Sequence, residues 1–124
     1  MTLAGLNVLE QAVMEKLLAG DHVLLAALRR QADSTLVVSR EYTGVGFYCV
    51  FEVRAPGVEG PLDFELADVY AAMEGVEHGV GFVLFVRNGR LAWLEGATFE
   101  GPWPRTLDRF QLFYRNEPRE LPFP

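Results

Sequence analysis

Apolar residues near the N-terminus recur at the spacing of an amphipathic helix. From Leu3 to Leu17 they lie three or four positions apart, and polar residues such as Glu10 fall between them. This is the period of a helix with one buried face. Gly20 ends the pattern, and Asp21 is suited to cap a second short helix. One helix with a kink at this Gly-Asp pair fits the same residues, although the pair favours a break.

From Thr35 onward the apolar pattern has the two-residue period of β-strands. Two prolines and two glycines at 55–61 indicate a loop. Asn88-Gly89 follows a run that is apolar on both faces, as in a central strand, and supplies the positive φ angles of a tight hairpin turn. The predicted strands cover residues 36–43, 45–54, 62–66, 79–87, 91–99 and 109–115.

Helices followed by strands with short connections indicate one α+β domain over residues 1–124. We expect an N-terminal helix or helix pair packed on the apolar face of a five- to six-stranded, mainly antiparallel sheet. A domain of this length buries roughly two thirds of the surface of its unfolded chain. An ordinary apolar core is therefore sufficient to hold it.

Charge and cysteine content narrow the classes of function. The chain has 17 Asp and Glu against 11 Lys and Arg, a formal net charge of −6, which argues against a nucleic-acid partner because phosphate binding needs clustered basic residues. The single cysteine, Cys49, excludes an intrachain disulfide and a multi-thiolate zinc site. We therefore expect a reducing, cytoplasmic setting.

The chain has no apolar run near the roughly 20 residues that cross a bilayer, and no basic leader precedes its first apolar stretch. We expect neither a membrane partner nor a signal peptide.

An acidic stretch in the middle of the chain is the main candidate for a binding surface. Six negative charges and no Lys or Arg lie between Glu59 and Glu77, so the rest of the chain is neutral overall. Such a surface can steer a basic protein partner. The alternative is an ordinary solvated strand face and loop. The residues that we expect to face the partner are Asp63, Glu65, Asp68, Glu74 and Glu77.

A second hypothesis is a pocket between helix and sheet that serves a small-ligand binder or a modest hydrolase. Phe47, Tyr48 and Trp93 are candidates for its lining, with His78 or Asp68 at its mouth. The 12% aromatic content, together with glycines that leave space unfilled, favours this hypothesis. A third is a homodimer formed through a sheet edge.

No motif in the chain indicates catalysis, a metal or a cofactor. Cys49 falls in the apolar register of its strand, which is typical of an inert core thiol. Asp63 and Glu65 share a strand face, but their spacing matches neither a calcium loop nor a zinc signature. We therefore expect no catalytic residue, no metal site and no cofactor, and we rank an interaction protein ahead of an enzyme.

Three stretches resemble a group of small uncharacterised bacterial proteins. They are Thr43-Gly-Val-Gly-Phe-Tyr48, the run from Glu77 to Gly96, and Gly101-Pro-Trp-Pro104. This resemblance implies no activity, cofactor or site residue. In size and acidic charge the chain is also similar to the immunity proteins of bacterial toxin systems, a likeness that implies masking of a basic toxin surface.

Overall fold

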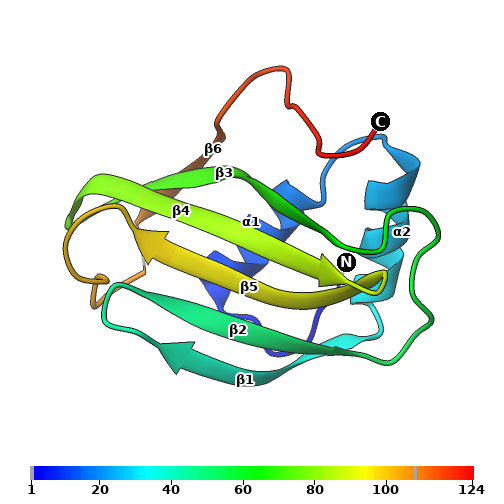
Figure 1. The fold of residues 1–124 in the computed structure, drawn as a ribbon. Helices are drawn as coiled ribbons and strands as arrows, with labels where there is room; N and C mark the ends of the chain where they lie inside the picture. Colours follow the sequence, from blue (N-terminus) through cyan, green and yellow to red (C-terminus); the bar gives the residue numbers. More distant parts are fainter. Residues whose placement is uncertain (1, 108) are drawn as a thin grey trace.

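The computed structural model describes residues 2–107 and 109–124 and confirms the α+β fold. Two helices precede six strands, which form one antiparallel sheet in the order β1-β2-β5-β4-β3-β6 (Figure 1). The elements are α1 (Val8–Leu17), α2 (Val23–Ala32), β1 (Thr35–Tyr42), β2 (Gly46–Val53), β3 (Phe64–Met73), β4 (Val76–Arg87), β5 (Arg90–Thr98) and β6 (Phe110–Tyr114).

The two helices are separate, and each begins at a side-chain cap. Asn7 accepts a hydrogen bond from the Glu10 amide while the Glu10 carboxylate accepts one from the Asn7 amide, which completes a capping box at α1. The expected cap of α2, Asp21, was wrong by one position. His22 is the cap, and its Nδ1 accepts from the Leu24 amide at 3.0 Å.

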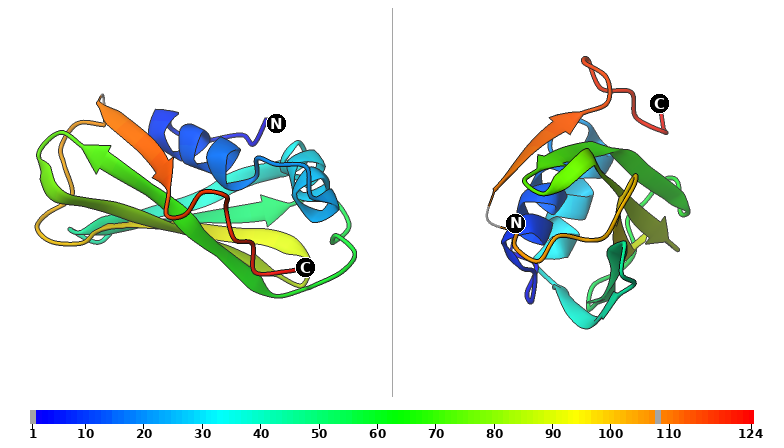
Figure 2. Two further views of the ribbon diagram at one scale, coloured as in Figure 1. Left: turned by 90° about the horizontal axis from the view of Figure 1, so that it is seen from above. Right: turned by 90° about the vertical axis from the view of Figure 1, so that its left-hand side faces the viewer.

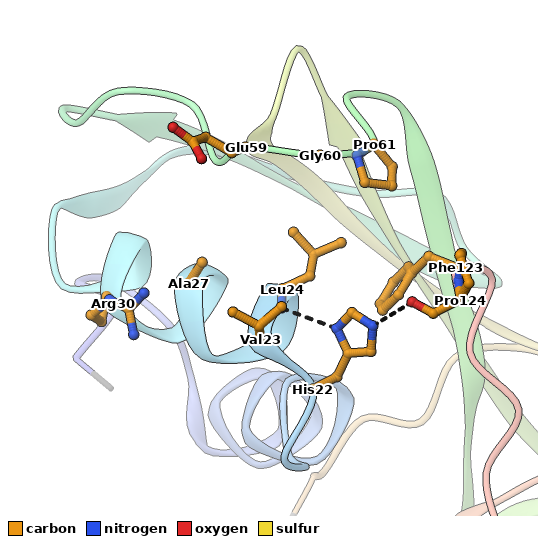
Figure 3. A pocket seen from close by; sticks show the side chains of 10 residues that line it. All are labelled: His22, Val23, Leu24, Ala27, Arg30, Glu59, Gly60, Pro61, Phe123 and Pro124. Atoms are coloured by element: carbon orange, nitrogen blue, oxygen red, sulfur yellow. Dashed lines mark hydrogen bonds between the residues drawn. The ribbon is translucent and has the colours of Figure 1, made fainter.

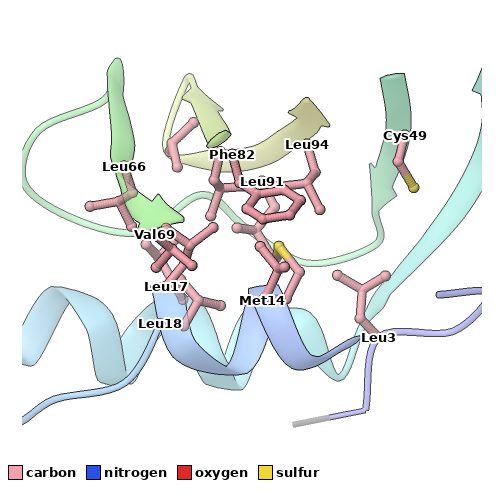
Figure 4. Packing of buried hydrophobic residues seen from close by; sticks show 14 of the residues in the cluster. Leu3, Met14, Leu17, Leu18, Cys49, Leu66, Val69, Phe82, Leu91 and Leu94 are labelled. Atoms are coloured by element: carbon pink, nitrogen blue, oxygen red, sulfur yellow. The ribbon is translucent and has the colours of Figure 1, made fainter. Parts of the chain in front are cut away.

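Both helices lie on the same face of the sheet, and the core fills the space between the two layers (Figure 2). Met14 and Leu17 of α1 meet Leu66, Phe82 and Leu94 of the strands there (Figure 4), and all five side chains are fully buried. Burial of each contributes about 1.5–3 kcal/mol. The opposite face of the sheet has no covering layer among the residues that the structure describes (Figures 1 and 2).

The hairpin at Asn88-Gly89 is confirmed, with φ angles of 54° and 70° at its two residues. By contrast, β3 runs on to Met73 and β4 starts at Val76, so both strands are longer than expected. A register shift between Leu66 and Val69 turns both residues toward the core. This bulge breaks the two-residue period of apolar positions, so the strand predicted from the sequence ended at Leu66.

Glycines allow the central strands to approach closely at one point. A Cβ atom on Gly46 would overlap the carbonyl oxygen of Gly96 on the neighbouring strand β5. A Cβ atom on Gly81 would come within 2.9 Å of the Phe99 ring.

No helix among the described residues has the length and apolar character needed to span a membrane.

Candidate functional site

Four of the five acidic residues predicted to form one surface lie at two ends of the sheet. Asp63 and Glu65 are at the start of β3, whereas Glu74 and Glu77 are at the β3–β4 turn (Figure 1). A ten-residue strand separates the two groups, which corresponds to roughly 30 Å. Asp68 lies between them but is only 6% exposed. The structure therefore brings no more than two of the five side by side.

Most of these carboxylates already have a partner within the chain. Arg87 donates to Glu65 at 3.0 Å, and the Asn88 amide donates to Asp63 at 2.9 Å. Arg119 forms two hydrogen bonds with Asp68, at 2.8 and 3.0 Å.

The pairs at the other end of the sheet are looser. Arg109 lies 3.6 Å from Glu74. His78 is 4.0 Å from Glu77 and 3.1 Å from Glu100. Three of the five predicted residues thus face an arginine, so the charge excess of the sequence stretch does not become a continuous acidic surface.

The residues predicted to line a helix–sheet pocket do not converge. Phe47 is buried on the helix-covered face of β2, and Tyr48, the next residue, points to the opposite face. Trp93 lies on that opposite face too, because its neighbour Leu94 is fully buried in the core. His78 is half exposed near the β3–β4 turn. Adjacent strand residues point to opposite sides of a sheet, so this set does not enclose one cavity.

Cys49 is fully buried on the core face of β2, and burial raises the pKa of its thiol to about 12. The Arg40 guanidinium is 4.0 Å from its Sγ, and this neighbouring cation lowers the pKa less than burial raises it.

We predict that the folded protein resists alkylation by iodoacetamide at pH 8–9. Raising a thiol pKa from about 8.5 to 12 cuts the thiolate fraction by roughly a thousandfold. Mass spectrometry should show slow modification in buffer and rapid modification in 8 M urea, since unfolding restores the ordinary pKa. Equal rates in the two solvents would contradict an inert core thiol.

The uncovered face of the sheet carries a continuous set of aromatic and aliphatic side chains, which we call the aromatic strip. Phe85 and Trp93 are paired across β4 and β5, and their rings stack at 4.2 Å. The Tyr70 ring contacts two others edge-on, at 5.6 and 6.0 Å. The strip consists of Tyr48, Val50, Tyr70, Val83, Phe85, Trp93, Phe99 and Phe113.

Four members of the aromatic strip are substantially exposed to solvent. Phe99 is 60% exposed, Phe113 45%, Tyr48 41% and Val50 37%. Isolated exposed apolar residues are ordinary, but a contiguous apolar patch on a soluble protein marks a binding surface. Aromatic residues are also enriched in the buried centres of protein–protein interfaces.

Two glutamates lie beside Tyr48 on this face of the sheet, and Glu95 stands within the aromatic strip, between Tyr48 and Val83. Glu41 of β1 and Glu95 of β5 lie directly opposite Tyr48 on its two sides. Glu95 accepts a hydrogen bond from the Trp93 indole at 3.2 Å. Neither carboxylate has a cationic partner among the residues that the structure describes. A cation that settles over Tyr48 would meet a carboxylate on each side.

Arg87 stands at the other end of the strip. Its guanidinium lies 5.3 Å from the Phe85 ring and 5.5 Å from the Trp93 ring. Since it also donates to Glu65, its charge is already partly neutralised. The free charge beside the aromatic strip is therefore that of Glu41 and Glu95.

A separate cavity of about 430 Å³ lies on the helix side of the molecule (Figure 3). Its walls come from α2, from residues 59–61 of the β2–β3 loop and from the C-terminal tail. His22, Leu24 and Phe123 form one end, and Arg30 and Glu59 are at the other (Figure 3). Sequence reasoning missed this cavity, because the tail that closes it lies about a hundred positions from α2.

The described residues contain no cluster of three or more His, Cys, Asp and Glu side chains that could hold a metal ion. Comparisons with protein-family models, with curated proteins and with solved structures found no match to this chain.

Proposed function

We propose that this chain is a non-enzymatic interaction protein that binds a basic protein partner through the aromatic strip. The exposed, contiguous apolar face of the sheet is the single observation that carries the proposal. The partner is still the basic protein that the acidic sequence predicted, but the surface that contacts it is a different one. The residues that meet the partner are those of the strip with Glu41 and Glu95, in place of Asp63, Glu65, Asp68, Glu74 and Glu77.

The charge pattern of the face supports a partner with Lys or Arg next to apolar side chains. A cation above Tyr48 gains from the ring and from the two flanking carboxylates. The apolar neighbours, such as Val50 and Phe99, would cover the rest of the contact. A partner that also carried acidic groups there would be repelled by Glu41 and Glu95.

The surroundings of the two histidines favour binding over catalysis. Both ring nitrogens of His22 are engaged with backbone groups, Nδ1 with the Leu24 amide and Nε2 with the Pro124 carbonyl at 2.7 Å. His78 is half exposed beside Glu100. Among the residues that the structure describes, neither ring forms a hydrogen bond with a serine or cysteine that it could activate.

The test compares two double variants as baits in affinity capture from a bacterial lysate, followed by affinity measurement with the purified partner. Tyr48→Ser with Val50→Ser removes two exposed side chains from the strip, and we expect binding to weaken at least about tenfold. Glu41→Gln should weaken it further, with an effect that shrinks at high salt. Val8→Ser with Glu15→Gln is the matched control, since both residues are exposed on α1.

Circular dichroism checks that every variant is folded. An affinity that is unchanged in Tyr48→Ser with Val50→Ser, or lowered equally in the α1 control, would remove the strip as the binding surface. Binding that does not respond to Glu41→Gln or to salt would remove the basic character of the partner. A homodimer through the aromatic strip, in place of the sheet edge considered from the sequence, has its own readout, because a doubled mass in sedimentation that disappears in the strip variant would identify a second copy as the occupant.

A further inference from the structure

The cavity beside α2 has the size and lining of a small-molecule site. Its volume of about 430 Å³ falls within the range of known ligand pockets, roughly 300–1,000 Å³. Val23 lies on its wall and is 76% exposed, although it is a β-branched apolar residue on the first turn of a helix. A ligand in the cavity would cover this side chain.

One end of the cavity is apolar because its polar atoms are already used. The His22 ring packs edge-on against Phe123 at 4.6 Å, and its two nitrogens bond to backbone groups of Leu24 and Pro124 (Figure 3). The ring therefore presents carbon atoms to the cavity. With Leu24 and Phe123 beside it, this end suits an aromatic or branched aliphatic group.

The other end carries one positive and one negative charge. Figure 3 shows Arg30 on α2 and Glu59 on the loop at the end of the cavity away from Phe123. Both are exposed, and among the described residues they form no ion pair with each other or with another side chain. The neighbouring Arg29 differs, since it donates to the carbonyls of Leu18 and Gly20.

We propose that this cavity binds a small zwitterion with an apolar side chain, namely an aromatic or branched aliphatic α-amino acid. The ligand's carboxylate would pair with Arg30 and its ammonium group with Glu59, while its side chain lies against Val23, Leu24 and Phe123. An apolar anion would be repelled by Glu59 and an apolar cation by Arg30. Only a ligand with both charges satisfies both groups. This site is independent of the aromatic strip, which lies on the opposite face of the sheet.

Titrations followed by ¹H–¹⁵N NMR test the proposal with L-phenylalanine and L-leucine as probes. We expect millimolar binding, with shifts concentrated at residues 22–30 and 59–61 and at Phe123. N-acetyl-L-phenylalanine lacks the ammonium group and L-phenylalaninamide lacks the carboxylate. Each should bind at least roughly threefold more weakly, as the loss of an exposed ion pair predicts.

Variants of the protein provide a second test of the amino-acid site. Arg30→Gln and Glu59→Gln are surface changes that leave the fold intact, and each should weaken L-phenylalanine to the affinity of the matching blocked probe. Ala27→Trp fills the cavity and should abolish the shifts. Arg105→Gln is the matched control, and Tyr48→Ser with Val50→Ser separates this site from the proposed protein-binding face. Both should bind the probe as the wild type does.

Three results would overturn the proposal. They are the absence of shifts at the cavity residues up to 20 mM probe, equal binding of the blocked and zwitterionic probes, and undiminished binding in Ala27→Trp. Failure of the wild-type protein to bind a basic protein partner, with amino-acid binding intact, would count only against the proposed function.

Discussion

Replacing Arg40 with methionine should lower the free energy of unfolding by about 3–5 kcal/mol. Arg40 donates from Nε to Oε2 of Glu10 at 2.8 Å and from a terminal nitrogen to Oε1 at 2.5 Å. The Glu10 side chain is only 1% exposed, whereas Arg40 is 25% exposed. Methionine keeps the apolar stem but removes the charge, so the variant leaves a carboxylate buried without a cation.

Urea denaturation of three variants separates the charge from the packing. Glu10→Gln with Arg40→Met should recover part of the loss, because a neutral amide replaces the unpaired carboxylate and can still accept from the Asn7 amide. The matched control is Arg54→Met, whose partner Glu52 is 52% exposed at 3.5 Å. We expect that change to cost less than about 1 kcal/mol. A loss in Arg40→Met no larger than in Arg54→Met would show that the buried pair adds nothing.

This ion pair also marks where prediction from the sequence stops. Glu10 falls between the apolar positions of its helix, so the pattern assigned it to the solvent side. In the structure a bulge between Val37 and Ser39 turns Arg40 toward the helix layer, opposite Cys49. The burial of Glu10 thus depends on a residue thirty positions away, and no helical period carries that information.

Structural features that depend on residues close together in the sequence were predictable. The hairpin at Asn88-Gly89 follows from two residues that accept positive φ, and the break between the helices follows from the Gly20-Asp21 pair. The α+β class follows from the order of the periods along the chain. The bulges in β1 and β3 were not predictable, because no turn residue in the sequence marks these two register shifts.

The candidate site was predicted less well than the fold, because sequence proximity is not spatial proximity. The acidic stretch extends along β3 and around a turn, so its charges separate. One signal did point to the aromatic strip. Two helices of ten residues each can cover only one face of a six-stranded sheet. The apolar outer positions of β4, such as Val83 and Phe85, therefore have no covering layer among the described residues.

The second large effect concerns the attachment of the C-terminal tail, and we expect Arg119→Ala to cost about 3 kcal/mol. The Asp68 side chain, 9% exposed, would lose both of its hydrogen bonds from Arg119. The carbonyls of Leu17 and Ala19, at the C-terminal end of α1, would lose their donors as well. Buried acceptors left without donors are costly, and those at a helix end have no intrahelical donor to replace the lost one.

The same change should free the tail, since Arg119 is its main polar link to α1 and β3. Hydrogen exchange should rise over residues 115–124 and at Leu24, where the cavity loses its Phe123 wall. Arg119→Lys should recover only part of the stability, because one ammonium group cannot reach a carboxylate and two carbonyls in the same planar geometry. Arg109→Ala is the matched control, as its pair with Glu74 is exposed, and it should cost less than about 0.5 kcal/mol. If Arg119→Ala proves as mild as that control, the tail is held by the packing of Phe123 against Phe64 and His22, and the ion pair contributes little.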